Sequence, residues 1–158
     1  MIRNSLLAAT LSIAGTTALV TQATAQSIDV PFTGVVQGRC SFNNLIPGVM
    51  VSDFPGPGSN KLDTRAPGGS SGAVTVVCNQ PADLIVGSPI QTAGPGTAGF
   101  VEVDVQSSNG GGSSPGLGGQ SLFLPPGQSQ LSVDMRVDSP APLPAGNYGY
   151  NVSLTVVP

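Results

Sequence analysis

The residue types that carry most enzyme chemistry are scarce in this sequence. It contains no histidine and only two cysteines, which argues against a histidine base and against a zinc site. Serines are abundant, but they lie in glycine-rich segments beside no identifiable base. Glu102 and Asp104 share one face of an alternating segment and could bind a cation, but we favour a solvated outer strand face. The sequence therefore predicts no catalytic residue, no metal site and no cofactor, and we do not expect an enzyme.

The two cysteines, Cys40 and Cys78, are instead expected to form a disulfide. An even cysteine count in an exported chain indicates disulfide bonding, and two cysteines allow a single pairing. Each falls on the apolar face of its alternating segment, so both side chains are predicted to point inward. By closing a long loop, the bond would stabilise a domain that is rich in glycine and poor in aromatic residues.

Export is predicted by the first 25 residues, which have the three regions of a signal peptide. Arg3 supplies the positive start, 6–20 is apolar or small, and Ala23-Thr24-Ala25 fits the small-x-small cleavage pattern. The alternatives are an uncleaved anchor and a chance apolar start. Cleavage would leave 26–158 as a single domain.

Composition favours an all-β domain without a nucleic-acid partner. Eight acidic residues outnumber five basic ones, and their scattered placement offers no basic patch for nucleic acid or an anionic membrane. The 22 glycines and 15 prolines gather in clusters between short runs of alternating apolar residues. This pattern is typical of short strands joined by turns and long loops.

The longest alternating segment is Ser27–Cys40, which predicts a strand with one buried face. The apolar or small face comprises Ile28, Val30, Phe32, Gly34, Val36, Gly38 and Cys40. The opposite face is mostly polar. The alternation would be the same whether the segment packs into its own domain or into the next copy of the protein.

The remaining runs predict seven or eight strands and no helix after residue 25. Further strands are predicted at 45–51, with an interruption at Pro47-Gly48, and at 73–78, 83–86, 100–105, 122–124, 129–137 and 147–157. The segments 55–72, 88–99 and 107–121 are predicted to be loops, and 55–72 and 107–121 to be exposed and mobile. The strand count and spacing favour a two-sheet sandwich of immunoglobulin-like size.

Three motifs resemble the spore coat protein U-like domain, the subunit type of archaic chaperone–usher pili. They are FTGVVQGRC at 32–40, VTVVC at 74–78 and AGNYGYNVSLTV at 145–156. They cover both ends of the mature chain and both cysteines.

The resemblance implies an incomplete immunoglobulin-like sandwich that is completed by donor-strand exchange. The donor strand would be 27–36, inserting the face that carries Ile28, Val30, Phe32, Gly34 and Val36, and the chain from Val36 to Cys40 would stay with its own domain. The acceptor groove would be lined by Tyr148, Tyr150, Val152, Leu154 and Val156. The implied partners are other copies of the chain, a periplasmic chaperone and an outer-membrane usher, and the implied destination is a fibre at the cell surface.

A second function class remains open from the sequence. A self-contained secreted β-sandwich could bind a ligand or a cell-surface partner through its glycine- and proline-rich loops. A complete sandwich is expected to be a stable monomer, whereas an incomplete one is expected to polymerise or to need a chaperone.

Overall fold

The computed structural model describes residues 26–53, 58–96, 99–109, 113–116 and 119–158. The predicted signal peptide, 1–25, lies outside these residues. The chain divides into two units, 1–35 and 36–158. About 52% of the described residues are in strands, and these residues contain no helix that is long and apolar enough to cross a membrane.

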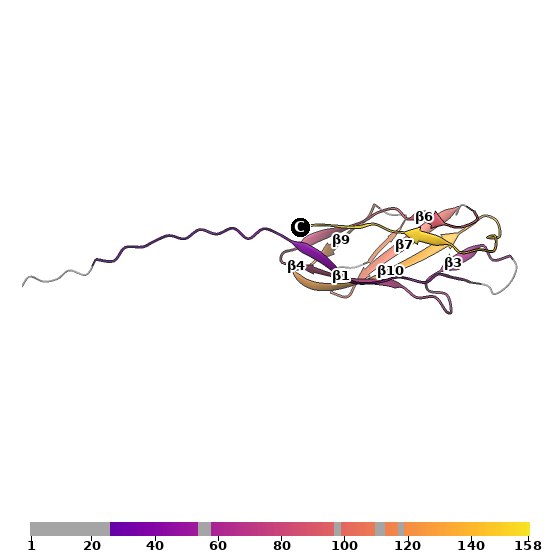
Figure 1. Cartoon of the computed structure of the whole chain (residues 1–158), viewed down its shortest axis with the longest axis horizontal. Coiled ribbons are helices and arrows are strands. Elements are labelled where there is room, and N and C mark those ends of the chain that lie inside the picture. Colours follow the sequence, from indigo (N-terminus) through magenta and orange to yellow (C-terminus); the bar gives the residue numbers. More distant parts are fainter. Residues whose placement is uncertain (1–25, 54–57, 97–98, 110–112, 117–118) are drawn as a thin grey trace, which may run out of the picture. The chain divides into compact units, whose positions relative to one another are not determined.

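Within the described part of the second unit, the regular elements are strands that pair antiparallel (Figure 1). They are β1 (Cys40–Ile46), β2 (Val51–Ser52), β3 (Lys61–Asp63), β4 (Gly72–Cys78), β5 (Ala82–Val86), β6 (Ile90–Ala93), β7 (Phe100–Ser107), β8 (Ser113–Gly116), β9 (Ser121–Leu124), β10 (Gly127–Asp138), β11 (Gly149–Asn151) and β12 (Leu154–Val157).

The largest sheet is built around β10, the longest strand. One edge of β10 pairs first with β4 and then with β3, and its other edge pairs with β7. β1 extends the sheet beyond β4, β2 extends it beyond β3, and β8 extends it beyond β7. A single strand thus organises the whole sheet.

Two smaller sheets, in the orders β12-β5-β9 and β11-β6, complete the domain. The core joins β4, β7 and β10 of the large sheet to β5 and β9, because alternate residues of these strands are apolar and point to one side. Its buried members are Val74, Val76, Cys78, Ala82, Leu84, Val86, Val103, Val105, Leu122, Leu124 and Leu131. This packing of sheet on sheet is compatible with a β-sandwich.

The predicted strands at 73–78, 83–86, 100–105, 122–124 and 129–137 are confirmed by β4, β5, β7, β9 and β10. The predicted strand at 45–51 is interrupted as expected at Pro47-Gly48, since β1 ends at Ile46 and β2 begins at Val51, but it contributes only the end of β1 and the start of β2. The predicted terminal strand is divided into β11 and β12 by Val152 and Ser153.

The prediction that 55–72, 88–99 and 107–121 are loops is wrong in part, because they contain β3, β6 and β8. Thr64 and Ala66 are also buried. Local composition could not show this, because the 58–72 segment is ordered by polar contacts with β10 that depend on the tertiary structure.

Candidate functional site: an open edge between two sheets

Two edge strands border the candidate site. β1 pairs only with β4, and β12 pairs only with β5, so each has one edge without a partner strand among the described residues. A hollow of about 320 Å³ lies between these strands, and we call it the open groove. It is lined by Phe42, Asn43, Asn44, Leu45, Val74, Val152 and Leu154.

The inner face of β1 is uncovered. Residues directly opposite each other in an antiparallel pair point to the same face of a sheet. Phe42 lies opposite Val76, which is buried in the core, so the phenyl ring belongs to the inner face. Nevertheless 44% of Phe42 is exposed. β1 therefore presents a core-facing side chain to solvent.

A β-bulge places a second apolar side chain in the open groove. The register between β1 and β4 shifts between Asn43 and Ile46, and Asn44 has a φ of 52°, in the left-handed region that asparagine tolerates better than most residues. The next residue, Leu45, lines the groove beside Val74 and is 78% exposed. The side chain of such a leucine contributes to stability only if another segment covers it and removes its apolar surface from water.

The other wall comes from the predicted acceptor residues, of which the structure brings three together. Val152, Leu154 and Val156 are half-buried and pack against the core, and the first two line the open groove. Tyr150 lies in β11, which pairs with β6. Tyr148 precedes β11 and lines a separate hollow with Leu62 and Leu143.

The predicted donor residues lie in 26–36, which we call the arm. Residues 26–39 belong to no strand, so the prediction of a long strand over Ser27–Cys40 is wrong for the single chain. Ile28, Phe32 and Val36 are 88%, 92% and 87% exposed, and Gly34 has no atom within 4 Å of the position of an added Cβ. The division of the chain into two units groups Val36 with the domain, although its side chain is exposed. Alternation makes a segment suitable for pairing, but a strand forms only where a partner edge is available.

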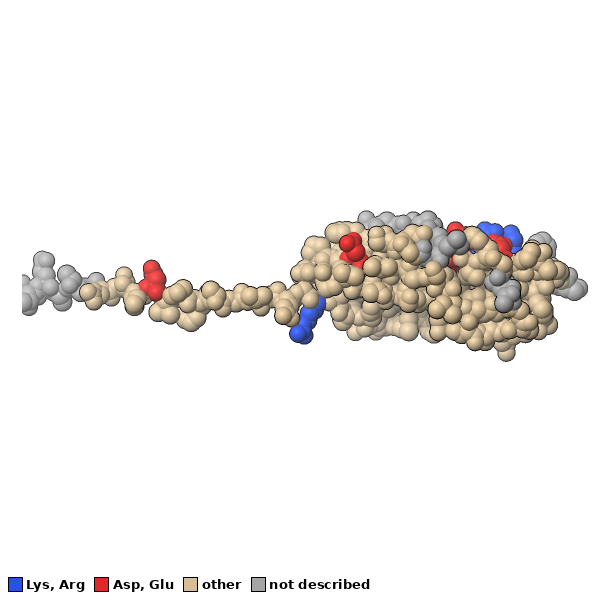
Figure 2. All heavy atoms as spheres, turned by 90° about the horizontal axis from the view of Figure 1, so that it is seen from above, with Lys and Arg blue, Asp and Glu red and all other residues tan. Residues whose placement is uncertain are grey.

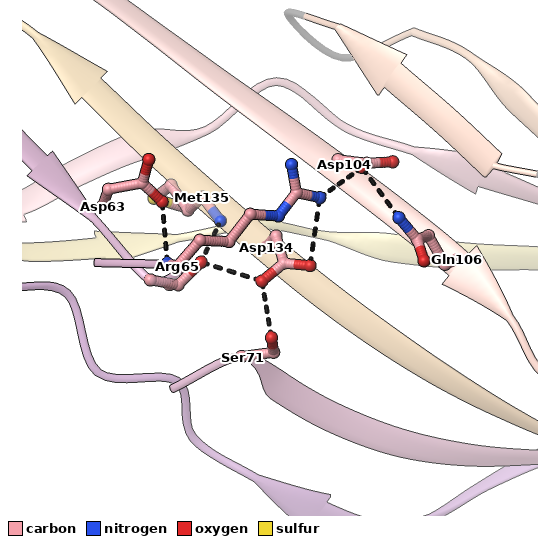
Figure 3. A network of polar contacts seen from close by, with 8 residues as sticks. Asp63, Arg65, Ser71, Asp104, Gln106, Asp134 and Met135 are labelled. Atoms are coloured by element: carbon pink, nitrogen blue, oxygen red, sulfur yellow. Dashed lines mark hydrogen bonds and ion pairs between the residues drawn. The ribbon is translucent and has the colours of Figure 1, made fainter. Parts of the chain in front are cut away.

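A polar network on the other face of the large sheet is the second candidate (Figure 3). Asp134 of β10 accepts hydrogen bonds from Thr64 Oγ1 at 2.9 Å and from Ser71 Oγ at 2.5 Å. The backbone N–H of Met135 donates to Thr64 Oγ1 at 3.1 Å. These bonds hold the 58–72 segment over β10, and both Thr64 and Asp134 are buried.

Arg65 joins this network to β7. Its guanidinium forms ion pairs with Asp104 and, at 3.2 Å, with Asp134. Gln106 Nε2 donates to Asp104 Oδ2 at 3.1 Å. The prediction that Asp104 lies on a simply solvated face is therefore wrong. Asp134 lies directly opposite Asp104 in the pairing of β10 with β7, so Arg65 contacts two neighbouring carboxylates.

The ionisation of Asp134 follows from these contacts. Burial alone would raise its pKa, but hydrogen bonds from Ser71, Thr64 and Arg65 outweigh burial and lower the pKa below its ordinary value. Arg65 has a raised pKa, chiefly because it hydrogen-bonds Asp104. Both groups are thus stabilised in their charged forms.

This network has the chemistry of a structural contact. Its carboxylates are directed at an arginine and at hydroxyl groups, and the described residues contain no group of three or more candidate ligands that could hold a metal ion. On the face shown in Figure 2, uncharged side chains cover most of the domain, so charge offers no large recognition surface there.

Sequence reasoning missed Phe42 and Leu45 on the groove wall, and Thr64 and Asp134 in the network. Phe42 could have been predicted, because the alternation through Val36, Gly38 and Cys40 continues to Phe42. Leu45 is out of phase because of the bulge, and the Thr64–Asp134 contact joins residues 70 positions apart. No local signal predicts either of these.

No protein-family model matches this chain, and no curated protein and no solved structure is significantly similar to it. The open groove and the exposed arm are therefore the features from which a function can be inferred.

Proposed function

We propose that this protein is a structural subunit of a secreted surface fibre of the chaperone–usher type, and that it polymerises by donor-strand complementation. One observation carries the proposal. Core-facing apolar side chains lie uncovered between β1 and β12, while an alternating apolar arm of the same chain is unpaired. The groove lacks a strand, and the arm lacks a sheet.

The spacing of the two surfaces supports this pairing. Ile28, Val30 and Phe32 recur at every second residue, and so do Val152, Leu154 and Val156. In strand addition, backbone hydrogen bonds join the edges and alternate side chains enter the groove. Each large apolar side chain that becomes fully buried contributes about 1.5–3 kcal/mol, which offsets the entropy lost on association. Pro31 would leave one backbone position unpaired, because it has no N–H.

Tyr148 supports the immunoglobulin-like part of the proposal. Its hydroxyl donates a hydrogen bond of 2.7 Å to the backbone carbonyl of Pro144, just before β11. A tyrosine that bonds upstream backbone in this way precedes strand F of immunoglobulin-like sandwiches, and strand G lies beside strand F in that fold. β11 and β12 then correspond to strand F, and the free edge of β12 is the place of strand G.

The proposed interface determines the assembly and the partners. An arm that enters the groove of another copy makes a head-to-tail contact, which produces an open filament when it does not close into a ring. Before assembly the apolar groove needs a cover, so a periplasmic chaperone and an outer-membrane usher are the expected partners. The finished fibre would lie at the cell surface.

Strand parity provides the test. Phe32→Asp puts a charge on the inserted face, and Thr33→Asp puts the same charge on the opposite face of the arm. We expect Phe32→Asp to reduce polymer yield at least about tenfold, since an unpaired carboxylate would be buried, and Thr33→Asp to leave it within about twofold. Size-exclusion chromatography of refolded protein measures both. Gly34→Leu, a shape change on the inserted face, is expected to slow assembly.

Equal polymer yields for the two aspartate variants would contradict the proposed parity. The fibre proposal as a whole fails if the unaltered mature chain is a stable monomer that unfolds once 26–34 is removed. In that case the arm would belong to its own domain.

A further inference from the structure

The chain is fastened immediately after the arm. The side-chain amide of Asn79 uses both ends: Oδ1 accepts from the backbone N–H of Arg39 at 2.7 Å, and Nδ2 donates to the carbonyl of Gln37 at 2.9 Å. The backbone N–H of Asn79 also donates to the carbonyl of Arg39 at 3.1 Å. We call these three bonds the Asn79 clamp. The disulfide between Cys40 and Cys78 lies one residue further on.

The clamp limits how the arm can fold back. β1 has a free edge, so in principle the arm of one chain could turn and pair with its own β1. To fill the open groove, such a hairpin has to place Phe32 or another residue of the same face opposite Phe42. Loops of three to five residues are common in hairpins.

Only some of these loops give the required parity. A five-residue loop over 35–39 sets Phe32 opposite Phe42, and a three-residue loop over 37–39 sets Gly34 there. A four-residue loop over 36–39 sets Thr33 opposite Phe42 and turns the polar face inward. Both loops of correct parity need the backbone of residues 37–39 to leave Asn79.

With the clamp closed, the reversal must lie before Gln37. A five-residue loop over 32–36 then takes up Phe32 itself, and it sets Val30 opposite Gly38 and Ile28 opposite Cys40. Neither side chain reaches Phe42. A three-residue loop over 34–36 does set Ile28 opposite Phe42, but the mature chain predicted to begin at Gln26 then has no apolar residue left to cover Leu45, so the groove is not filled.

We infer that Asn79 is a positioning residue that keeps the arm from filling its own groove, so that the occupant of the groove is the arm of a second copy. This inference rests on the proposed fibre function and adds to it the reason for assembly between copies.

The test compares Asn79→Ala with Asn60→Ala in the mature chain. Asn60 is a matched control, because it is also exposed and its amide also donates to a backbone carbonyl, that of Ser139 at 3.1 Å. Hydrogen exchange of the arm amides is measured in the whole sample and in the monomer fraction over about a hundredfold range of protein concentration. In the unaltered chain and in Asn60→Ala, arm protection should rise with concentration and be absent from the monomer.

In Asn79→Ala, a monomer with a protected arm should appear, and its share should be independent of concentration. Loss of two hydrogen bonds predicts an increase of about tenfold in that share. A second variant leaves Asn79 intact: about six Gly/Ser residues inserted after Val36 supply the length for Phe32 to reach Phe42 past the clamp. This insertion should also produce the closed monomer.

The outcomes separate the two proposals. If the unaltered chain assembles and Asn79→Ala behaves like Asn60→Ala, the inference about Asn79 is overturned and the fibre function stands. If the insertion variant forms a closed monomer but folded Asn79→Ala does not, the inference about Asn79 is also overturned. The length of the arm, and not the clamp, would then prevent closure. If the arm of the unaltered chain gains no protection at any concentration, the fibre function itself fails.

Discussion

The open groove and the network around Asp134 lie on opposite faces of one sheet, and they differ in how their side chains are satisfied. In the network, a buried carboxylate receives hydrogen bonds from Thr64, Ser71 and Arg65 of a single covering segment. In the groove, Phe42 and Leu45 point to the inner side of the sheet without a cover.

The physical reason is the difference between polar and apolar burial. A buried charge without partners costs several kcal/mol, so the chain has to provide its partners during its own folding. An exposed leucine does not contribute the stability that its burial would provide, but it leaves no buried polar group without a partner. It can therefore remain exposed until a second chain covers it. We therefore expect the network to stabilise each subunit and the groove to stabilise the assembly.

The largest effect is expected at the disulfide that attaches the groove wall to the core. Replacing both cysteines, Cys40→Ala with Cys78→Ala, removes a cross-link between residues 38 positions apart. The chain-entropy model predicts a loss of about 4 kcal/mol in unfolding free energy. Urea denaturation of the monomer measures the loss. In the unaltered chain, thiol titration of the unfolded, unreduced protein should find no free thiol. A loss below about 1 kcal/mol would show that β1 is held without the cross-link.

A pair of leucines tests the groove directly. Leu84 is fully buried, so Leu84→Ala should cost about 3 kcal/mol in the unfolding free energy of the monomer. Leu45→Ala should change that value by less than about 0.5 kcal/mol, because most of Leu45 is in solvent. In the assembled protein the Leu45 variant should lose stability as well. If Leu45→Ala destabilises the monomer as much as Leu84→Ala, the groove is already filled in the single chain.

The network is tested by Asp134→Asn, which keeps the shape of the side chain and removes its charge. We expect a loss of about 2 kcal/mol in the monomer at neutral pH, since hydrogen bonds to a charged group are among the stronger ones. Polymer yield per folded monomer should be unchanged, because Asp134 lies on the other face of the sheet.

The same variant predicts a pH dependence. The pKa of Asp134 is lowered by folding, so its stabilising contribution is complete above the ordinary value of 3.8 and is lost as the pH falls through the lower folded value. The stability difference between the natural chain and Asp134→Asn should therefore shrink as the pH falls below 3.8. Urea midpoints measured at several acidic pH values test this, and a difference that grows on acidification would contradict it.

Within the network, the smaller effect is expected at Arg65, whose side chain is about half exposed. Arg65→Ala should cost less than about 1 kcal/mol, because water screens ion pairs at such positions. The loss should decrease further in high salt. A large loss that is independent of salt would show that Arg65 acts as part of the buried network.

Sequence periodicity determined much of the fold. β4, β5, β7, β9 and β10 were predictable because their apolar residues alternate and their boundaries are marked by glycine, proline and asparagine. The disulfide was predictable because only one pairing of two cysteines exists.

Only the tertiary structure decided which alternating segments are buried. Phe32 and Leu131 belong to equally regular alternations, yet Phe32 is exposed and Leu131 lies in the core. Alternation states which face of a segment prefers burial, whereas burial itself needs a neighbouring edge or sheet. β10 has such neighbours on both edges, whereas the arm pairs with no strand among the residues that the structure describes. The bulge at Asn44, the cover over Asp134 and the Asn79 clamp likewise depend on contacts between residues distant in the sequence, which local patterns do not record.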